Sequence, residues 1–215
     1  MRSILFFIFF IAAGPVLAQQ QVLTYHYDNQ RTGWNQNETI LTPANVPGLR
    51  LLASVPLDDE VVAQPLVYNG IIYVVTKNNS VYSIDASGNI LTQQNLGPPI
   101  GNFGILSTPV IDPTSSTLYV MVYFDANNDL NNQLPTYQLH ALDANSLTDK
   151  VTPVTVSASG RLTNGSTYQF DASVTEQRPA LLLSTNGNIY AGFGAFYDSN
   201  PNAARGWLLS WQGGP

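Results

Sequence analysis

Beyond residue 48, apolar residues occur in short runs rich in Val, Ile, Leu and Tyr, separated by Gly, Asn, Pro and Ser. Runs of this kind are typical of β-strands joined by turns, and no run with helical spacing interrupts them. The first group comprises Val61 to Tyr68, Ile71 to Thr76, Val81 to Asp85 and Asn89 to Gln94. Asn69-Gly70 predicts a tight hairpin between the first two runs, because both residues tolerate positive φ. The pattern therefore predicts a four-stranded antiparallel sheet.

The same pattern recurs twice further along the chain. Three motifs begin the units: Gln64-Pro65-Leu66-Val67, Thr108-Pro109-Val110-Ile111 and Arg178-Pro179-Ala180-Leu181. The intervals between the prolines are 44 and 70 residues. A four-stranded propeller blade takes about 40–50 residues. The longer interval fits the same blade with loops inserted near 125–136 and 157–176.

Each unit continues with a tyrosine strand and a second apolar strand. The tyrosine strands are Ile72-Tyr73-Val74, Leu118-Tyr119-Val120 and Ile189-Tyr190-Ala191; the second strands are Val81 to Ala86, Gln138 to Ala144 and Gly206 to Trp211. Apolar residues on both faces of these strands indicate sheets that are covered on both sides, as stacked blades are. We predict an all-β fold, a partial β-propeller of about three four-stranded antiparallel blades. The alternative is a β-sandwich, which also has short, regularly spaced strands.

The first residues have the layout of a secretory signal peptide. A positive start, Met1-Arg2-Ser3, precedes the apolar run Ile4 to Ala13, and Val16 and Ala18 occupy the −3 and −1 cleavage positions. The apolar run is too short to span a bilayer as a helix. We predict a signal peptide at 1–18, an extended N-terminal segment at 19–48 and blades at 49–215. The mature chain is then exported to the periplasm or outside the cell, without a membrane span.

Composition removes several classes of function. The 215 residues include no cysteine, which excludes disulfides, thiol nucleophiles and iron–sulfur clusters. A net charge of −6 with eight scattered Lys and Arg argues against a nucleic-acid partner. Charged residues make up 10% and hydrophobic residues 44% of the chain, a balance typical of a folded protein.

The repeat resembles the pyrroloquinoline-quinone-type (PQQ-like) propeller repeat, in an exported bacterial group. The resemblance rests on Tyr73-Val74, Tyr82-Ser83-Ile84-Asp85-Ala86 and their counterparts at 119–120 and 139–144, together with the start segment Tyr25 to Gly33. The docking tryptophan of that repeat is absent, with Thr92 in its place in the first unit, and so is the cysteine pair that quinoprotein dehydrogenases share. The resemblance therefore implies a fold, and a cofactor does not follow from it.

The number of units bears on whether a ring can close. Closed propellers have roughly 4–8 blades, and three are visible here, the third without an outer strand before Pro215. We expect the chain to be an N-terminal fragment of a longer propeller. In such folds the N-terminal segment often pairs with the last blade, and Leu49 to Leu57 is the candidate strand.

Few residues have the makings of a chemical site. His26 with Asp28 and Arg31 suits a base oriented by a carboxylate, but no nucleophile motif accompanies them, which favours structural capping. His140 takes a repeat position that belongs to an aromatic residue, which favours packing. Asp125, Asn127, Asp129 and Asn131 alternate as oxygen ligands of a calcium loop do, although Leu130 replaces the turn glycine and Thr136 the bidentate glutamate. The alternative is a solvated hairpin tip. We predict no catalytic residues.

Gln64, Thr108 and Arg178 precede the three repeat prolines. If the prolines begin the innermost strands, these three side chains lie at one mouth of the central channel, where polar groups can bind a ligand or merely solvate loop ends. We predict a non-enzymatic binding or scaffold module without a cofactor, whose partner is an unknown protein, peptide or small molecule. The alternative is the remnant of a PQQ-dependent quinoprotein oxidoreductase, with PQQ and calcium as cofactors.

Overall fold

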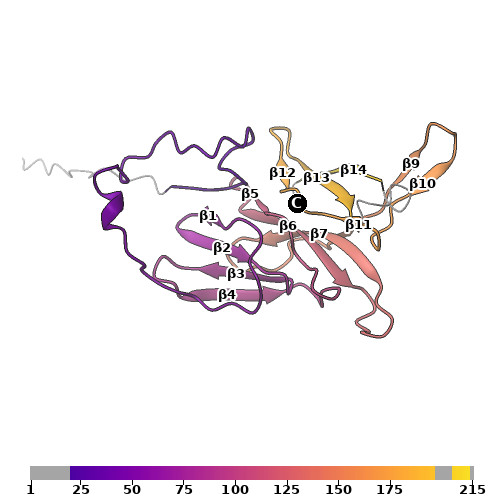
Figure 1. Ribbon diagram of the computed structural model, residues 1–215, viewed down its shortest axis with the longest axis horizontal. Coiled ribbons are helices and arrows are strands. Elements are labelled where there is room, and N and C mark those ends of the chain that lie inside the picture. The colour runs from indigo at the N-terminus through magenta and orange to yellow at the C-terminus, as the bar shows by residue number, and fades with distance from the viewer. Residues whose placement is uncertain (1–19, 197–204, 214–215) are drawn as a thin grey trace, which may run out of the picture.

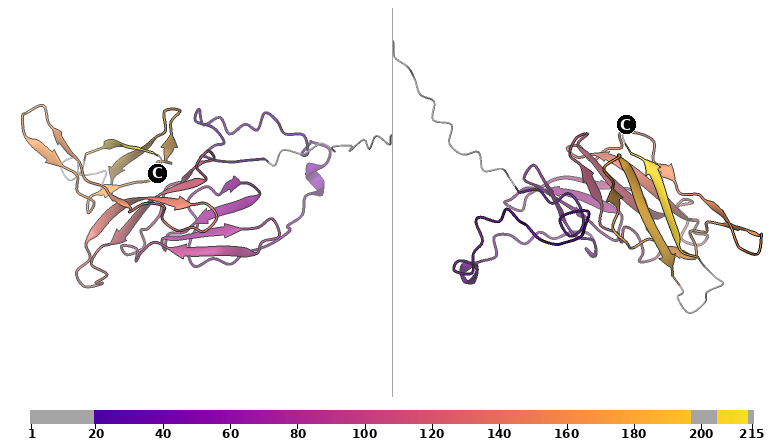
Figure 2. Two further views of the ribbon diagram at one scale, coloured as in Figure 1. Left: turned by 180° about the vertical axis from the view of Figure 1, so that it is seen from behind. Right: turned by 90° about the horizontal axis from the view of Figure 1, so that it is seen from above.

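The computed structural model describes residues 20–196 and 205–213, so the predicted signal peptide at 1–18 lies outside the described residues. Strands and loops make up nearly all of this part of the chain. The one helix found there is a single 3₁₀ turn, η1 (Val46–Gly48). Three antiparallel sheets follow one another along the chain and lie side by side (Figure 1, Figure 2).

The first sheet contains β1 (Leu66–Tyr68), β2 (Ile71–Val75), β3 (Ser80–Ile84) and β4 (Ile90–Asn95), in that order. The predicted hairpin is confirmed, since Asn69 and Gly70 have φ angles of 48° and 77°. The prediction of a first strand from Val61 was wrong, because β1 begins only after Pro65. Backbone groups before Pro65 are bonded elsewhere: the Gln64 N–H donates to Thr108, and the Glu60 carbonyl accepts from Lys77.

The second sheet contains β5 (Val110–Asp112), β6 (Thr117–Asp125), β7 (Pro135–Asp143) and β8 (Val154–Thr155). β6 and β7 pair along their whole length, from Thr117 opposite Asp143 to Asp125 opposite Pro135. The loop predicted near 125–136 is therefore shorter than expected. It covers 126–134 and forms the tip of this long hairpin.

The third sheet contains β12 (Leu182–Leu183), β13 (Asn188–Ala195) and β14 (Trp207–Gln212), with β11 (Thr175–Glu176) paired to the other end of β13. The insert predicted as a loop at 157–176 is partly ordered into strands. It holds β11 and a separate hairpin of β9 (Ser159–Arg161) and β10 (Thr167–Gln169), which projects from the body in Figure 1.

The three sheets are equivalent units, and we call them blades 1, 2 and 3. Three tyrosines of the repeat lie opposite the inner strands in the same register: Tyr73 opposite Leu66, Tyr119 opposite Val110 and Tyr190 opposite Leu182. The inner strand β5 contacts both β1 and β12. Inner strands side by side with sheets fanning outward define a partial β-propeller, and the predicted fold class is confirmed.

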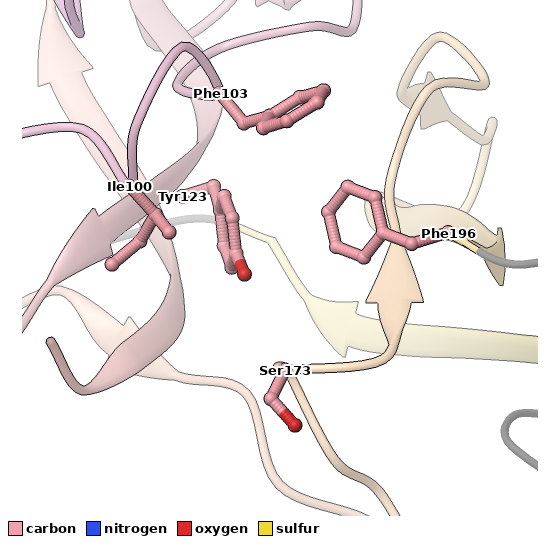
Figure 3. Close-up of a pocket in the computed structure, with 5 residues that line it drawn as sticks. All are labelled: Ile100, Phe103, Tyr123, Ser173 and Phe196. Carbon is pink, nitrogen blue, oxygen red and sulfur yellow. The ribbon is translucent and has the colours of Figure 1, made fainter.

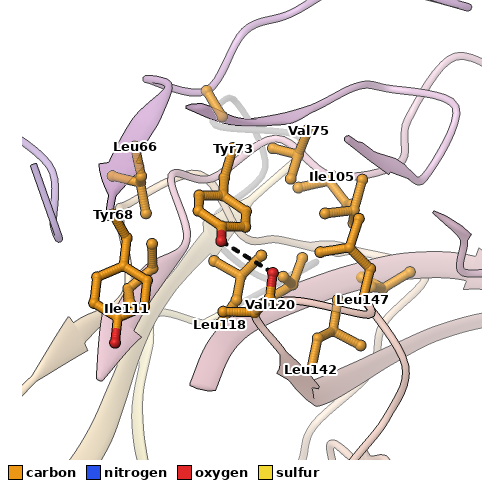
Figure 4. Close-up of a cluster of buried hydrophobic side chains, with 14 residues drawn as sticks. Leu66, Tyr68, Tyr73, Val75, Ile105, Ile111, Leu118, Val120, Leu142 and Leu147 are labelled. Carbon is orange, nitrogen blue, oxygen red and sulfur yellow. Dashed lines mark hydrogen bonds between the residues drawn. The ribbon is translucent and has the colours of Figure 1, made fainter. Parts of the chain in front are cut away.

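Apolar side chains fill the space between neighbouring blades. Between blades 1 and 2 they include Leu66, Val75, Leu118 and Leu142, and the buried Tyr73 hydroxyl donates to the Ala144 carbonyl at 3.0 Å (Figure 4). A second cluster lies between blades 2 and 3 and includes Tyr119, Met121, Leu181, Ile189 and Phe193. Every residue of β3 is buried, so the predicted coverage of both sheet faces is confirmed.

The segment Leu49 to Leu57 forms no strand, so the prediction of an outer strand there was wrong for the described structure. Val55 and Leu57 instead pack against Val74 and Tyr82 in a third apolar cluster on blade 1. The carboxylate of Asp58, just beyond, accepts hydrogen bonds from Thr76 and Asn78 at 2.8 and 2.9 Å and from Ser80. These bonds hold the segment on the face of the blade, away from any strand edge.

Candidate binding site

The residues that precede the repeat prolines do not all meet. The Gln64 backbone N–H donates to Thr108 Oγ1 at 2.9 Å, and the Thr108 carbonyl accepts from the Leu181 N–H at 3.0 Å. Thr108 is buried and links all three blades. Arg178 lies apart, because its side chain is 68% exposed and its Nε donates to Glu176 at 2.8 Å. The structure therefore joins two of the three predicted mouth residues.

An extended segment, residues 20–33, crosses the inner strands, and we call it the N-terminal strap. Val22 pairs with Val67 of blade 1, and the Leu23 carbonyl accepts from the Ile111 N–H of blade 2 at 2.9 Å. The Asn29 side-chain amide donates to the Leu183 carbonyl of blade 3 at 2.8 Å. The strap therefore makes hydrogen bonds to all three blades.

Arg31 fastens the strap. Its guanidinium donates to Thr24 Oγ1 at 2.6 Å, to the Tyr25 carbonyl at 2.7 Å and to the Leu181 carbonyl at 3.0 Å. Burial lowers the pKa of Arg31 against the raising effect of Asp28. The structure places His26 and Asp28 in local contacts as well: His26 Nδ1 lies 3.3 Å from the Arg31 carbonyl, and Asp28 accepts from Thr32. These are the contacts of a structural cap.

The strap also occupies the polar groups of the mouth. Gln64 Oε1 accepts the His26 N–H at 3.1 Å, and the Gln64 amide nitrogen lies 3.5 Å from the Thr24 carbonyl. PQQ is a flat, anionic ring system, and holding it requires cationic or amide donors directed at it. Here the donors of Arg31 and Gln64 are directed at the strap and at blade 3, and Arg178 is paired with Glu176. The described residues at the mouth do not fit the quinone.

The predicted calcium ligands form the tip of the β6–β7 hairpin. The Asp125 carboxylate accepts three backbone N–H groups, from Leu134 at 2.7 Å, Asp129 at 2.9 Å and Asn127 at 3.1 Å. Burial acts to raise the pKa of Asp125, but these hydrogen bonds outweigh it and hold the pKa below the usual 3.8. The Asp129 carboxylate accepts the Asn131 N–H at 3.0 Å. Calcium binding here stays a prediction, which calorimetry with millimolar calcium tests.

His140 lies in β7, packed inside blade 2. Its Nδ1 is 3.1 Å from both carboxylate oxygens of Asp149, while Nε2 is buried without a hydrogen-bond partner. Burial lowers the pKa of His140, and the neighbouring Asp149 acts in the opposite direction. The orphaned Nε2 supports the lowering, because a second N–H in that place would have no acceptor. The position is that of the packing residue expected from the repeat.

An aromatic pocket, which the sequence did not indicate, lies between blades 2 and 3 (Figure 3). Its cavity is about 250 Å³, and it is lined by Ile100, Phe103, Tyr123, Ser173 and Phe196. Ile100 and Phe103 come from the β4–β5 loop, Tyr123 from β6, Ser173 from the insert before β11, and Phe196 from the end of β13. These segments are far apart in the sequence, so no local motif could have marked the pocket.

Comparison with known proteins gives one kind of likeness. No family model matches the chain, and no curated protein matches it. Among solved structures it is similar to the quinohemoprotein alcohol dehydrogenase from Comamonas testosteroni, with a TM-score of 0.62 and 19% sequence identity. The match covers 89% of this chain and 25% of that protein, so the chain spans about a quarter of its length. At this identity the likeness shows the fold, that of a quinoprotein-type β-propeller. In the described residues no helix has the length and apolar character needed to cross a membrane.

Proposed function

We propose that the chain is an exported β-propeller repeat protein that acts as a non-enzymatic binding or scaffold module. The observation that carries this proposal is the N-terminal strap across the inner strands. Arg31 and Gln64 are the polar residues best placed to hold a ligand at the mouth, and their hydrogen bonds fix the strap instead. A mouth closed by the chain itself suits a rigid support whose binding surfaces lie elsewhere. The partner is a protein, a peptide or a small molecule.

The second candidate function is that of a PQQ-dependent oxidoreductase remnant. It is favoured by the likeness to a quinohemoprotein alcohol dehydrogenase. That likeness extends to a quarter of the dehydrogenase at 19% identity, which supports a common fold and carries no catalytic residue across.

One experiment separates the two functions. The purified mature chain is mixed with PQQ and calcium chloride, desalted, and examined for quinone absorbance, with a quinoprotein apoenzyme as the positive control. The module proposal expects no absorbance in the protein fraction. Stoichiometric retention that is lost in Gln64→Ala would overturn it in favour of the oxidoreductase.

Export is part of the same proposal. Cleavage after Ala18 leaves Gln19 as the first residue of the mature protein. Expression of the full chain in a secreting bacterial host, followed by N-terminal sequencing of the periplasmic and medium fractions, should give Gln-Gln-Gln-Val. Recovery of uncleaved chain from the cytoplasm alone would contradict export.

A further inference from the structure

We propose that the aromatic pocket between blades 2 and 3 binds an uncharged aromatic ring. This inference rests on the proposed function, because it names the ligand class of the binding module. Figure 3 shows the rings of Phe103, Tyr123 and Phe196 around one space, with Ser173 on the side away from Phe103. The Phe103 and Phe196 centroids are 5.3 Å apart at an interplanar angle of 66°, and those of Tyr123 and Phe196 are 5.7 Å apart at 40°.

The ring arrangement suits another aromatic group. Aromatic pairs favour edge-to-face and offset geometries, because the negative face of one ring attracts the positive edge of another. The walls of the pocket are inclined to each other in this way. A flat ligand ring placed among them meets ring faces and ring edges together, which a saturated sugar ring exploits less fully.

Charge decides which aromatic ligands fit. None of the five lining residues carries a charge. A charged ligand would give up hydration in this cavity without gaining a counter-ion. The net charge of −6 makes anions less favourable still.

The volume is adequate for one or two rings. An apolar cavity of about 150 Å³ is known to admit benzene, and this pocket measures about 250 Å³. A phenyl or indole ring is therefore of the right size.

The walls are held in place before any ligand arrives. Ile100 and Phe103 exchange two backbone hydrogen bonds, at 3.0 and 2.9 Å, which closes their loop. The Tyr123 hydroxyl donates to the Ala172 carbonyl at 3.1 Å, and the Phe196 N–H donates to the Val174 carbonyl at 3.2 Å. A preformed pocket loses little conformational entropy when it binds.

The test uses indole as the probe, with saturation-transfer NMR and calorimetry on the mature chain. Phe103 is 39% exposed on a surface loop, so Phe103→Ala should keep the fold and remove one wall. We expect it to weaken indole binding about fivefold or more, the range of one aromatic contact. Leu134→Ala is the matched control: Leu134 is also exposed and in a loop but does not line the pocket, and the variant should bind like the parent. Ser173→Phe, which places a ring at the edge of the cavity, should block binding.

Two further probes separate the possible failures. Indole-3-acetate carries the same ring with a negative charge, and methyl β-glucopyranoside is uncharged without an aromatic ring; both should bind more weakly than indole. Binding of the glucoside that depends on Phe103, without binding of indole, would overturn the ligand class and leave the binding module intact. No binding of any probe would overturn the pocket as a ligand site, while the quinone experiment above judges the module proposal separately. Equal binding of indole by Phe103→Ala and Ser173→Phe would also overturn the assignment.

Discussion

The backbone N–H of Gln64 donates to Thr108 Oγ1 at 2.9 Å, across 44 residues of sequence. Both residues precede a repeat proline, so equivalent positions of neighbouring blades are joined by a direct hydrogen bond. The Thr108 carbonyl makes the next link, to Leu181 of blade 3. One threonine thus connects the inner ends of all three blades, and four predictions test this organisation.

Thr108→Val should destabilise the fold. Valine keeps the shape of threonine but removes the acceptor, and a buried N–H left without a partner costs about 1–3 kcal/mol. Urea unfolding monitored by tryptophan fluorescence measures the loss. Thr92→Val on the outer strand β4 is the control and should change stability by less than about 0.5 kcal/mol. Equal effects of the two substitutions would show that the link between blades is not important.

Arg31→Ala should loosen the N-terminal strap without unfolding the blades. The Val67 and Ile111 amides donate to carbonyls of the strap, so their hydrogen exchange reports whether it is bound. Loss of a charged hydrogen-bonding group of this kind should speed their exchange about tenfold or more. Arg50→Ala, an exposed arginine outside the strap, should leave these rates unchanged.

Gly104→Ala should destabilise the contact between blades 1 and 2. A Cβ at this buried position would overlap the Lys77 carbonyl oxygen and lie 2.6 Å from Asn79 Oδ1. Overpacking of this kind costs about 1–3 kcal/mol, measured by the thermal unfolding midpoint. Gly48→Ala meets nothing within 4 Å and is the matched control, expected to be neutral. An unchanged midpoint for Gly104→Ala would contradict the close approach of this loop to the β2–β3 turn.

Stability should fall as the pH drops below about 6.5, the usual histidine pKa. Burial lowers the pKa of His140 in the folded state, so the unfolded chain binds more protons there in this range. The contribution is fully present above the unfolded pKa and is lost on acidification, at no more than about 1.4 kcal/mol per pH unit. Unfolding midpoints from pH 8 to 5 measure it. His140→Phe should flatten the curve below pH 6.5, and an unchanged slope would assign the acid sensitivity to other groups.

The repeat was readable because local chemistry specifies each strand and turn. Asn69-Gly70 requires a tight hairpin wherever it lies, and the tyrosines at 73, 119 and 190 mark one register in each blade. The errors have a common cause, which is competition from distant partners. Val61 begins no strand because the backbone nearby is bonded to Lys77 and Thr108, and Leu49 to Leu57 packs on a blade face instead of a strand edge.

The sequence alone determined the all-β class, the period of the repeat and the prolines before the inner strands, because alternation and turn chemistry act over a few residues. Tertiary structure decided that the strap crosses three blades, that Arg178 stands apart from Gln64 and Thr108, and that three aromatic rings from separate segments surround one pocket. Such contacts depend on how the blades stack, and the free energy of stacking comes from side chains that have no fixed spacing along the chain.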